Sequence, residues 1–123
     1  MRASVILAGL ASLVAAAPSV QISAGDIPAG EIGIIFTYTN GSQSAQTSVA
    51  NSISQVPLNS GGIVDNVFVH PPSNPAVPGH YLGASCAFLD FQSRGLGVGH
   101  VNGPGIIILE SKDVIEYVQC NTD

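Results

Sequence analysis

The stretch EIGIIFTYT, residues 31–39, indicates the fold more clearly than any other part of the chain. Large apolar side chains recur in it at every second position, namely Ile32, Ile34, Phe36 and Tyr38. Successive side chains of a β-strand point to opposite faces, so a period of two predicts a strand with one buried face. We therefore expect a strand over residues 31–39 whose apolar face lies in a core.

Asn40-Gly41 directly follows this stretch. The pair favours a type I′ hairpin turn, because both central residues of that turn need positive φ. The return strand is expected over residues 46–54, where Val49 and Ile53 stand among Ser, Thr and Asn. A strand this polar is expected at the edge of a sheet or facing solvent.

Glycine and proline divide the rest of the chain into short β-branched segments, which is the pattern of a sandwich or barrel. Further strands are expected over residues 19–24, 63–69, 80–91, 94–101, 106–109 and 113–120, with a turn at 57–62. The unbroken apolar run Ile106–Leu109 predicts a central strand covered on both faces. One helical turn capped at Ser111–Asp113 is the alternative for the last segment, although its residues prefer strands. The predicted fold class is all-β, a single-domain antiparallel β-sandwich or small barrel.

Residues 70–79 contain four prolines. Proline fixes φ and lacks an N–H group, so a stiff surface loop between strands is expected here. A polyproline ligand for an aromatic groove has a similar composition and is the alternative.

The N-terminal segment, residues 1–17, has the pattern of a cleaved signal peptide. Arg2 precedes an apolar run that ends in Ala15-Ala16-Ala17, with cleavage expected after Ala16 or Ala17. The run is about a dozen residues long, whereas a membrane span needs about 20. A buried N-terminal helix is disfavoured because the run has no polar face. We expect a secreted, extracellular domain over residues 18–123, without a membrane anchor.

The charge of the chain excludes several classes of partner. Without Arg2 the formal net charge falls from −5 to −6, and Arg94 and Lys112 are the remaining basic side chains. Two isolated cations cannot follow a phosphate backbone, so nucleic-acid binding and polybasic attachment to membranes are not expected.

Cys86 and Cys120 are the two cysteines of the chain. In an oxidising secretory route they are expected to form a disulfide, with two buried free thiols as the alternative and a metal pair less favoured. Closing a loop of about 34 residues stabilises the folded chain by roughly 3 to 4 kcal/mol in the chain-entropy description. Asn40-Gly41-Ser42 is also a sequon, which makes Asn40 the expected glycosylation site.

Three histidines, His70, His80 and His100, stand with Asp65 and Asp90 as candidates for a metal site or an acid–base pair. Their spacings of ten and twenty residues match no metal-binding template. Each histidine adjoins proline or glycine, so exposed positions at strand ends are expected.

Other segments resemble catalytic motifs only in part. Ser85 lies in GASCA, which departs from the nucleophile elbow GxSxG at its second glycine and is followed by strand residues. The run Gly95–Gly99 resembles a phosphate-binding loop, but no helix or lysine follows it. The carboxylates available to a glycosidase are Asp65, Asp90, Glu110 and Glu116, which the sequence does not pair. We therefore expect no enzyme, no cofactor and no metal site.

The aromatic side chains offer a surface for carbohydrate, although the absence of Trp argues against a sugar platform. Core packing is the expected role of most of these rings, which include Tyr38 and Tyr117. The predicted binding surface consists of four side chains in or beside loops, Tyr81, Phe91, His70 and His80.

Several segments together resemble small secreted proteins of filamentous ascomycete fungi, among them candidate effectors and elicitors that act on plant hosts. They are VAAAPS (14–19), the Asn-Gly after a strand, ANSISQVPLNSGG (50–62), SCAFLDF (85–91) and GPGIIILESKDVIEYVQC (103–120). The resemblance implies a β-sandwich with one disulfide, Cys86–Cys120, and no enzymatic site. The chain lacks the further cysteines of hydrophobins and cerato-platanins.

The expected function is that of a secreted non-enzymatic interaction protein, effector-like or elicitor-like, acting at the host interface. Its partner would be a host protein or a cell-wall component, and the sequence predicts no oligomeric state. A cell-wall or surface protein that binds polysaccharide is the alternative, and a secreted hydrolase is the third hypothesis.

Overall fold

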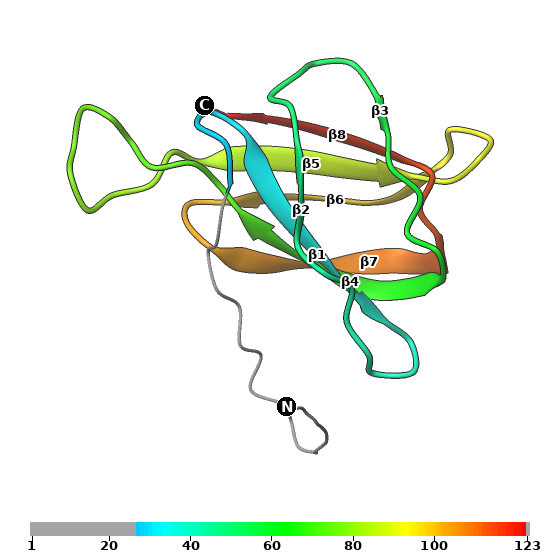
Figure 1. Ribbon diagram of the computed structural model, residues 1–123. Coiled ribbons are helices and arrows are strands. Elements are labelled where there is room, and N and C mark those ends of the chain that lie inside the picture. Colours follow the sequence, from blue (N-terminus) through cyan, green and yellow to red (C-terminus); the bar gives the residue numbers. More distant parts are fainter. Residues whose placement is uncertain (1–26, 123) are drawn as a thin grey trace.

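The computed structural model describes residues 27–122 and contains eight β-strands (Figure 1). They are β1 (Ile32–Tyr38), β2 (Thr47–Val49), β3 (Val56–Pro57), β4 (Ile63–His70), β5 (Ala84–Leu89), β6 (Gly95–Val101), β7 (Gly105–Val114) and β8 (Tyr117–Thr122). The expected signal peptide, residues 1–17, and the expected strand at 19–24 lie outside the described residues.

The strands form two four-stranded sheets. The first has the order β2-β1-β4-β7 and the second the order β3-β8-β5-β6, and every pairing is antiparallel. Inward side chains of both sheets belong to one buried cluster, which lies between the sheets. Between residues 27 and 122 there is no helix, and so none long and apolar enough to cross a membrane. The predicted all-β antiparallel sandwich is confirmed.

The period of two in β1 divides its side chains as expected. Ile32, Ile34 and Phe36 are buried in the core between the sheets. Ile35 points the other way and pairs with Phe68 of β4 on the outer face of the first sheet. Both of these outward side chains are also buried, so β1 carries more apolar contact than a strand with one wet face.

The turn after β1 differs from the predicted type I′ hairpin. Gly41 has a φ of 92°, whereas Asn40 is not among the described residues with positive φ. The Gly41 N–H donates to the Tyr38 carbonyl and the Tyr38 N–H donates to the Ser42 carbonyl. This is a three-residue loop, in which one residue with positive φ is sufficient. Asn40 keeps negative φ because Gly41 alone supplies the left-handed conformation.

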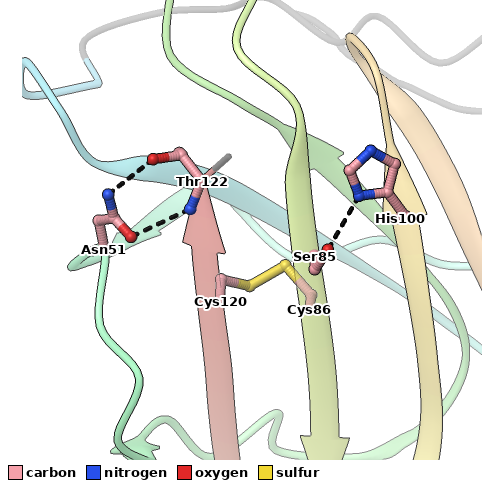
Figure 2. Close-up of a disulfide and its surroundings, with 6 residues drawn as sticks. All are labelled: Asn51, Ser85, Cys86, His100, Cys120 and Thr122. Carbon is pink, nitrogen blue, oxygen red and sulfur yellow. Dashed lines mark hydrogen bonds between the residues drawn. A yellow bond between two sulfur atoms is a disulfide. The ribbon is translucent and has the colours of Figure 1, made fainter.

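The predicted return strand at 46–54 is divided between the two sheets. Residues 47–49 form β2 at the edge of the first sheet, as the polar sequence predicted. The chain then leaves this sheet and bonds to the end of the second one. The Asn51 amide donates to the Thr122 hydroxyl at 2.8 Å and accepts from the Thr122 N–H at 3.1 Å (Figure 2).

The expectation of a central strand at Ile106–Leu109 is wrong. β7 lies at the end of the first sheet, and its side chains alternate: Ile107 and Leu109 are buried, whereas Ile106 and Ile108 are 59% and 69% exposed. An unbroken apolar run therefore does not show by itself that both faces are covered. β7 is also longer than predicted, and no helical turn occurs at Ser111–Asp113.

The glycines of β6 allow the two sheets to approach each other at β7. A Cβ atom at Gly97 would lie 3.1 Å from the Leu109 Cα, and one at Gly99 would lie 2.9 Å from two Ile107 side-chain carbons. Larger residues would push β6 away from β7 at the side of the sandwich where both strands are last in their sheets. The run Gly95–Gly99 is therefore part of a strand, as expected, and its glycines serve packing.

Cys86 and Cys120 form a disulfide, which confirms the predicted pair. The two residues are direct partners in the β5–β8 ladder, and their Cα atoms are 4.1 Å apart. Both side chains belong to the buried core. The bond joins the central strands of the second sheet across 34 residues of sequence (Figure 2).

We expect the Cys86→Ala variant to unfold with a free energy about 3 to 4 kcal/mol lower than the wild type, because the unfolded chain is no longer closed into a loop. Thermal and denaturant unfolding measure the difference. Reduction of the wild-type protein should reproduce the loss and add nothing to the variant. An unchanged melting temperature under reduction would show that the bridge does not stabilise this fold.

Candidate functional site

A cleft of about 410 Å³ opens where the start of the described chain meets the proline-rich loop. Residues 27–31 form one wall. His70, residues 71–73 and Tyr81 form the other, at the base of the loop between β4 and β5 that projects from the sandwich in Figure 1. Its volume is in the range of sites that take small molecules or single side chains.

The cleft brings together two of the four predicted binding residues. The rings of His70 and Tyr81 meet edge to face, with centroids 5.3 Å apart. His70 ends β4, while Tyr81 is held beside the loop by a bridge to Ser73. The His70 Nδ1–H donates to the Pro71 carbonyl at 3.1 Å, which fixes the orientation of the imidazole.

Both polar and apolar groups line the walls of this cleft. The Glu31 carboxylate accepts a hydrogen bond of 2.8 Å from the Ser48 hydroxyl, which holds it beside β2. On the same side, Ile27 packs over Gly33, where a Cβ atom would lie 2.6 Å from the Ile27 Cδ1. The loop wall is stiffened by two prolines, Pro71, which is fully buried, and Pro72, which is partly buried. The cleft is thus a preformed surface with one carboxylate, one imidazole and one phenol.

The other two predicted binding residues lie elsewhere. His80 is exposed in the loop, where its backbone N–H donates to the Val77 carbonyl. It does not line the cleft. Phe91 is 68% exposed in the turn after β5, whereas Tyr81 precedes that strand. The two aromatic side chains are therefore at opposite ends of β5.

A second hollow, of about 420 Å³, lies on the outer face of the second sheet. Ser85 of β5 and His100 of β6 are cross-strand partners in this hollow, and their Oγ and Nδ1 atoms are 2.9 Å apart (Figure 2). On the other side of the ring, His100 Nε2 lies 3.0 Å from the Asn102 Oδ1. A hydroxyl, an imidazole and an amide are thus linked in one chain.

The sequence motifs single out Ser85 and His100 separately, but they do not indicate Asn102 or the link between the three residues. The turn itself does not predict the link, because Leu89 pairs with Gly95 beside the turn and this register would place residue 85 opposite residue 99. A bulge between Phe88 and Leu89 shifts the register by one residue and brings Ser85 opposite His100. His100 and Asn102 then share a face because they are two residues apart.

The four carboxylates considered for a glycosidase serve separate local contacts. Asp65 accepts from the Asn66 amide and lies 3.4 Å from the Lys112 ammonium, and Glu116 accepts from Asn59. Asp90 is buried in the β5–β6 turn, and Glu110 is exposed on β7. None of these four carboxylates lines the cleft or the hollow. Among residues 27–122, no three His, Cys, Asp or Glu side chains are grouped so as to hold a metal ion.

Comparison of the chain with protein-family models, with curated proteins and with solved structures gives no match. No residue role is therefore carried over from another protein. The roles discussed below follow from the geometry of the cleft and the hollow.

Asp90 holds the β5–β6 turn together and is 2% exposed. Its Oδ1 accepts from the backbone N–H groups of Arg94 and Gln92, both at 2.9 Å, and its Oδ2 accepts from the Arg94 guanidinium at 3.0 Å. The backbone hydrogen bond from Arg94 lowers the pKa of this carboxyl below its ordinary value of 3.8, opposed in part by desolvation. Asp90 is thus a structural residue of the turn.

Because this pKa is lower in the folded state, the unfolded chain binds the proton more tightly. The stabilisation is therefore complete above about pH 4 to 5 and is lost as the pH falls through the folded-state pKa. We expect the Asp90→Asn variant to lose more stability at about pH 7 than at about pH 2. Urea unfolding across this range measures it. Arg94→Ala keeps the backbone donors and should retain most of the pH dependence. An equal loss in both variants would contradict the leading role of the backbone hydrogen bond.

Proposed function

We propose that this chain is a secreted interaction protein of the fungal effector or elicitor type, which binds a host component through the cleft at His70 and Tyr81. The leader-like N-terminus and the resemblance of several segments to such proteins support export and host contact. The Cys86–Cys120 disulfide is compatible with an oxidising extracellular environment. The role proposed for the cleft is binding without catalysis.

The observation that carries this proposal is the preformed surface around Tyr81. The phenol is 39% exposed, so it can contact a partner, while its ring is already oriented by His70 and by the bridge to Ser73. Aromatic side chains that are rigid before binding lose little conformational entropy in a complex. The stiff prolines on the same wall have the same effect. The cleft therefore suits a partner that inserts one small group between its two walls.

The charge of the chain favours particular inserted groups. The cleft contains the Glu31 carboxylate, and the whole chain has a formal charge of −5. A partner group that donates hydrogen bonds, such as a basic side chain or a sugar hydroxyl, would pair with Glu31 and pack on Tyr81. An acidic group would meet repulsion from Glu31.

Polysaccharide binding at the cell wall is the alternative, and the exposed ring of Tyr81 favours it. Aromatic rings pack against the apolar faces of sugars, and neighbouring carboxylates accept hydrogen bonds from their hydroxyls. The cleft presents a single exposed tyrosine, without a second aromatic platform on its walls. Binding of an isolated sugar is therefore expected to be weak, and retention on a polymer is the appropriate assay.

We expect purified protein to trigger a defence response, measured as ion leakage, when it is infiltrated into plant leaf tissue. Tyr81→Ala should abolish the response because it removes the oriented ring from the cleft. Phe91→Ala is the matched control: it also removes an exposed aromatic ring, but at the other end of β5, and should leave the response unchanged.

A parallel pull-down on chitin and β-glucan distinguishes polysaccharide binding at the cell wall from binding of a host component. Retention of the wild type that is lost in Tyr81→Ala supports wall binding in place of host signalling. If neither assay distinguishes Tyr81→Ala from wild type, the cleft is not the binding surface. If Phe91→Ala alone loses activity, the surface lies at the β5–β6 turn.

We further propose that Asn40 carries a glycan. Asn40, Gly41 and Ser42 are exposed at the tip of the β1–β2 hairpin. The Asn40 Oδ1 accepts hydrogen bonds from the Ser42 N–H and the Ser42 hydroxyl, at 2.9 Å and 2.6 Å. The sequon thus presents its side chain at an exposed turn, where a large glycan would not disturb the sheet.

Expression of the full chain in a secreting yeast tests export and the glycan together. We expect protein in the medium that begins at residue 17 or 18 and whose mass falls after treatment with an N-glycosidase. Asn40→Gln should be secreted with the lower mass from the start, because it keeps the hairpin but loses the acceptor. Retention in the cell with residues 1–17 intact would refute export, and an untreated mass equal to that of Asn40→Gln would refute the glycan.

A further inference from the structure

The hydrogen bonds around His100 define where the protons lie. The Asn102 Oδ1 can only accept, so the proton of the neutral imidazole is on Nε2. Nδ1 therefore carries a lone pair, and the Ser85 hydroxyl donates to it across 2.9 Å. An imidazole oriented by a third group and accepting from a hydroxyl is the arrangement that activates serine as a nucleophile.

The strand register places a further polar group beside Ser85. β5 lies between β6 and β8, so Ser85 has His100 as its cross-strand partner on one side and Asn121 on the other. All three residues line the hollow. Directly opposite residues of an antiparallel pair have Cβ atoms roughly 4.5 to 5.5 Å apart. The Asn121 amide is therefore within reach of a group bound to the Ser85 oxygen.

The next row of the sheet gives the hollow an apolar part. Ala87 pairs with Val98 of β6, and the Val98 side chain is 69% exposed. Together they form a small hydrophobic surface beside the hydroxyl. The hollow, of about 420 Å³, is open on the outer face of the sheet, so it suits a short acyl group with an apolar leaving group more than a long chain.

From this geometry we propose that the hollow is a second functional site, which hydrolyses short-chain carboxylic esters through an acyl group on Ser85. The Ser85 Oγ attacks the ester carbonyl while its proton passes to His100 Nδ1. The bond to the alcohol oxygen breaks, and the alcohol leaves with the proton from His100. Water then attacks the acyl group, His100 takes its proton and returns it to the Ser85 oxygen, and the carboxylic acid is released.

The remaining residues have separate roles in this reaction. The Asn121 amide donates to the oxygen that becomes negative during attack, which is the role of an oxyanion-hole donor. Asn102 touches only His100 in the reaction, so it is a positioning residue that fixes the tautomer. Val98 and Ala87 hold the apolar part of the ester.

The test uses the purified secreted protein with 4-nitrophenyl acetate as the ester. We expect nitrophenolate release above the buffer rate, and a peptide containing Ser85 that carries one acetyl group after rapid quenching. Ser85→Ala should abolish the adduct and the release. His100→Ala should lower the rate by about 10² or more, which is the usual contribution of a general base. Removing one oxyanion donor in Asn121→Ala should lower kcat by a similar factor.

His80→Ala is the matched control, because free imidazoles hydrolyse nitrophenyl esters without any site. His80 is exposed and outside the hollow, so its variant should keep the wild-type rate. Asn102→Ala should lower kcat and leave KM unchanged, since Asn102 does not contact the ester. Thermal melting of each variant verifies that it is folded. The acetyl adduct is measured on the wild-type protein, so this part of the test does not depend on the folding of any variant.

Three results would overturn the proposal. One is a wild-type rate equal to that of buffer. Another is a Ser85→Ala variant as active as the wild type, which would mean that histidine alone reacts. The third is an acetyl group found on other residues and not on Ser85. None of these results bears on host binding by the cleft, which is measured separately.

Discussion

The pairing of Cys86 with Cys120 is the constraint on which the outer face of the second sheet depends. The bond joins residues that are directly opposite in the β5–β8 ladder, and both point into the core. A slip of one residue would move every side chain of a strand to the other face. With the cysteines held inward, Ser85 and Asn121 must point outward and must lie side by side. The disulfide that stabilises the core thus also determines which polar groups meet on the outer surface.

A second constraint acts on the same sheet from inside. Gly97 and Gly99 face β7 so closely that a Cβ atom at either position would overlap with Leu109 or Ile107. These contacts hold β6 against the end of the first sheet. They place Gly97 and Gly99 inward, and so turn Val98 and His100 between and beside them outward. The hollow at Ser85 and His100 therefore has two supports on its inner side, the disulfide between β5 and β8 and the close approach of β6 to β7. The cleft at Tyr81 is built differently, from loop segments whose shape depends on prolines.

The sequence predicted local features where one local rule was sufficient. The period of two predicted β1, the neighbouring turn residues predicted the boundaries of β4 and β6, and the presence of two cysteines predicted the disulfide. The rules failed where neighbours from elsewhere in the chain decide. Ile106–Leu109 has the sequence of a buried central strand, yet it lies at the end of a sheet, and its Ile106 and Ile108 side chains are exposed because β6 packs against the other face. Asn40-Gly41 favours a type I′ turn, but a three-residue loop joins β1 to its partner with only Gly41 at positive φ.

By itself, then, the sequence determined the all-β class, the alternation of the strands and the cysteine pair, because each depends on residues near one another in the chain or on a choice without alternatives. It also placed His70 and Tyr81 in a predicted binding surface, whereas it gave Ser85 and His100 no catalytic role. Only the tertiary structure decided that His70 meets Tyr81 in a cleft, that Phe91 lies at the far end of β5, and that Ser85, His100 and Asn102 form one chain of hydrogen bonds. The physical reason is that these contacts depend on strand register and sheet order. Both are set by the packing of many side chains in one core, which no short segment of sequence contains.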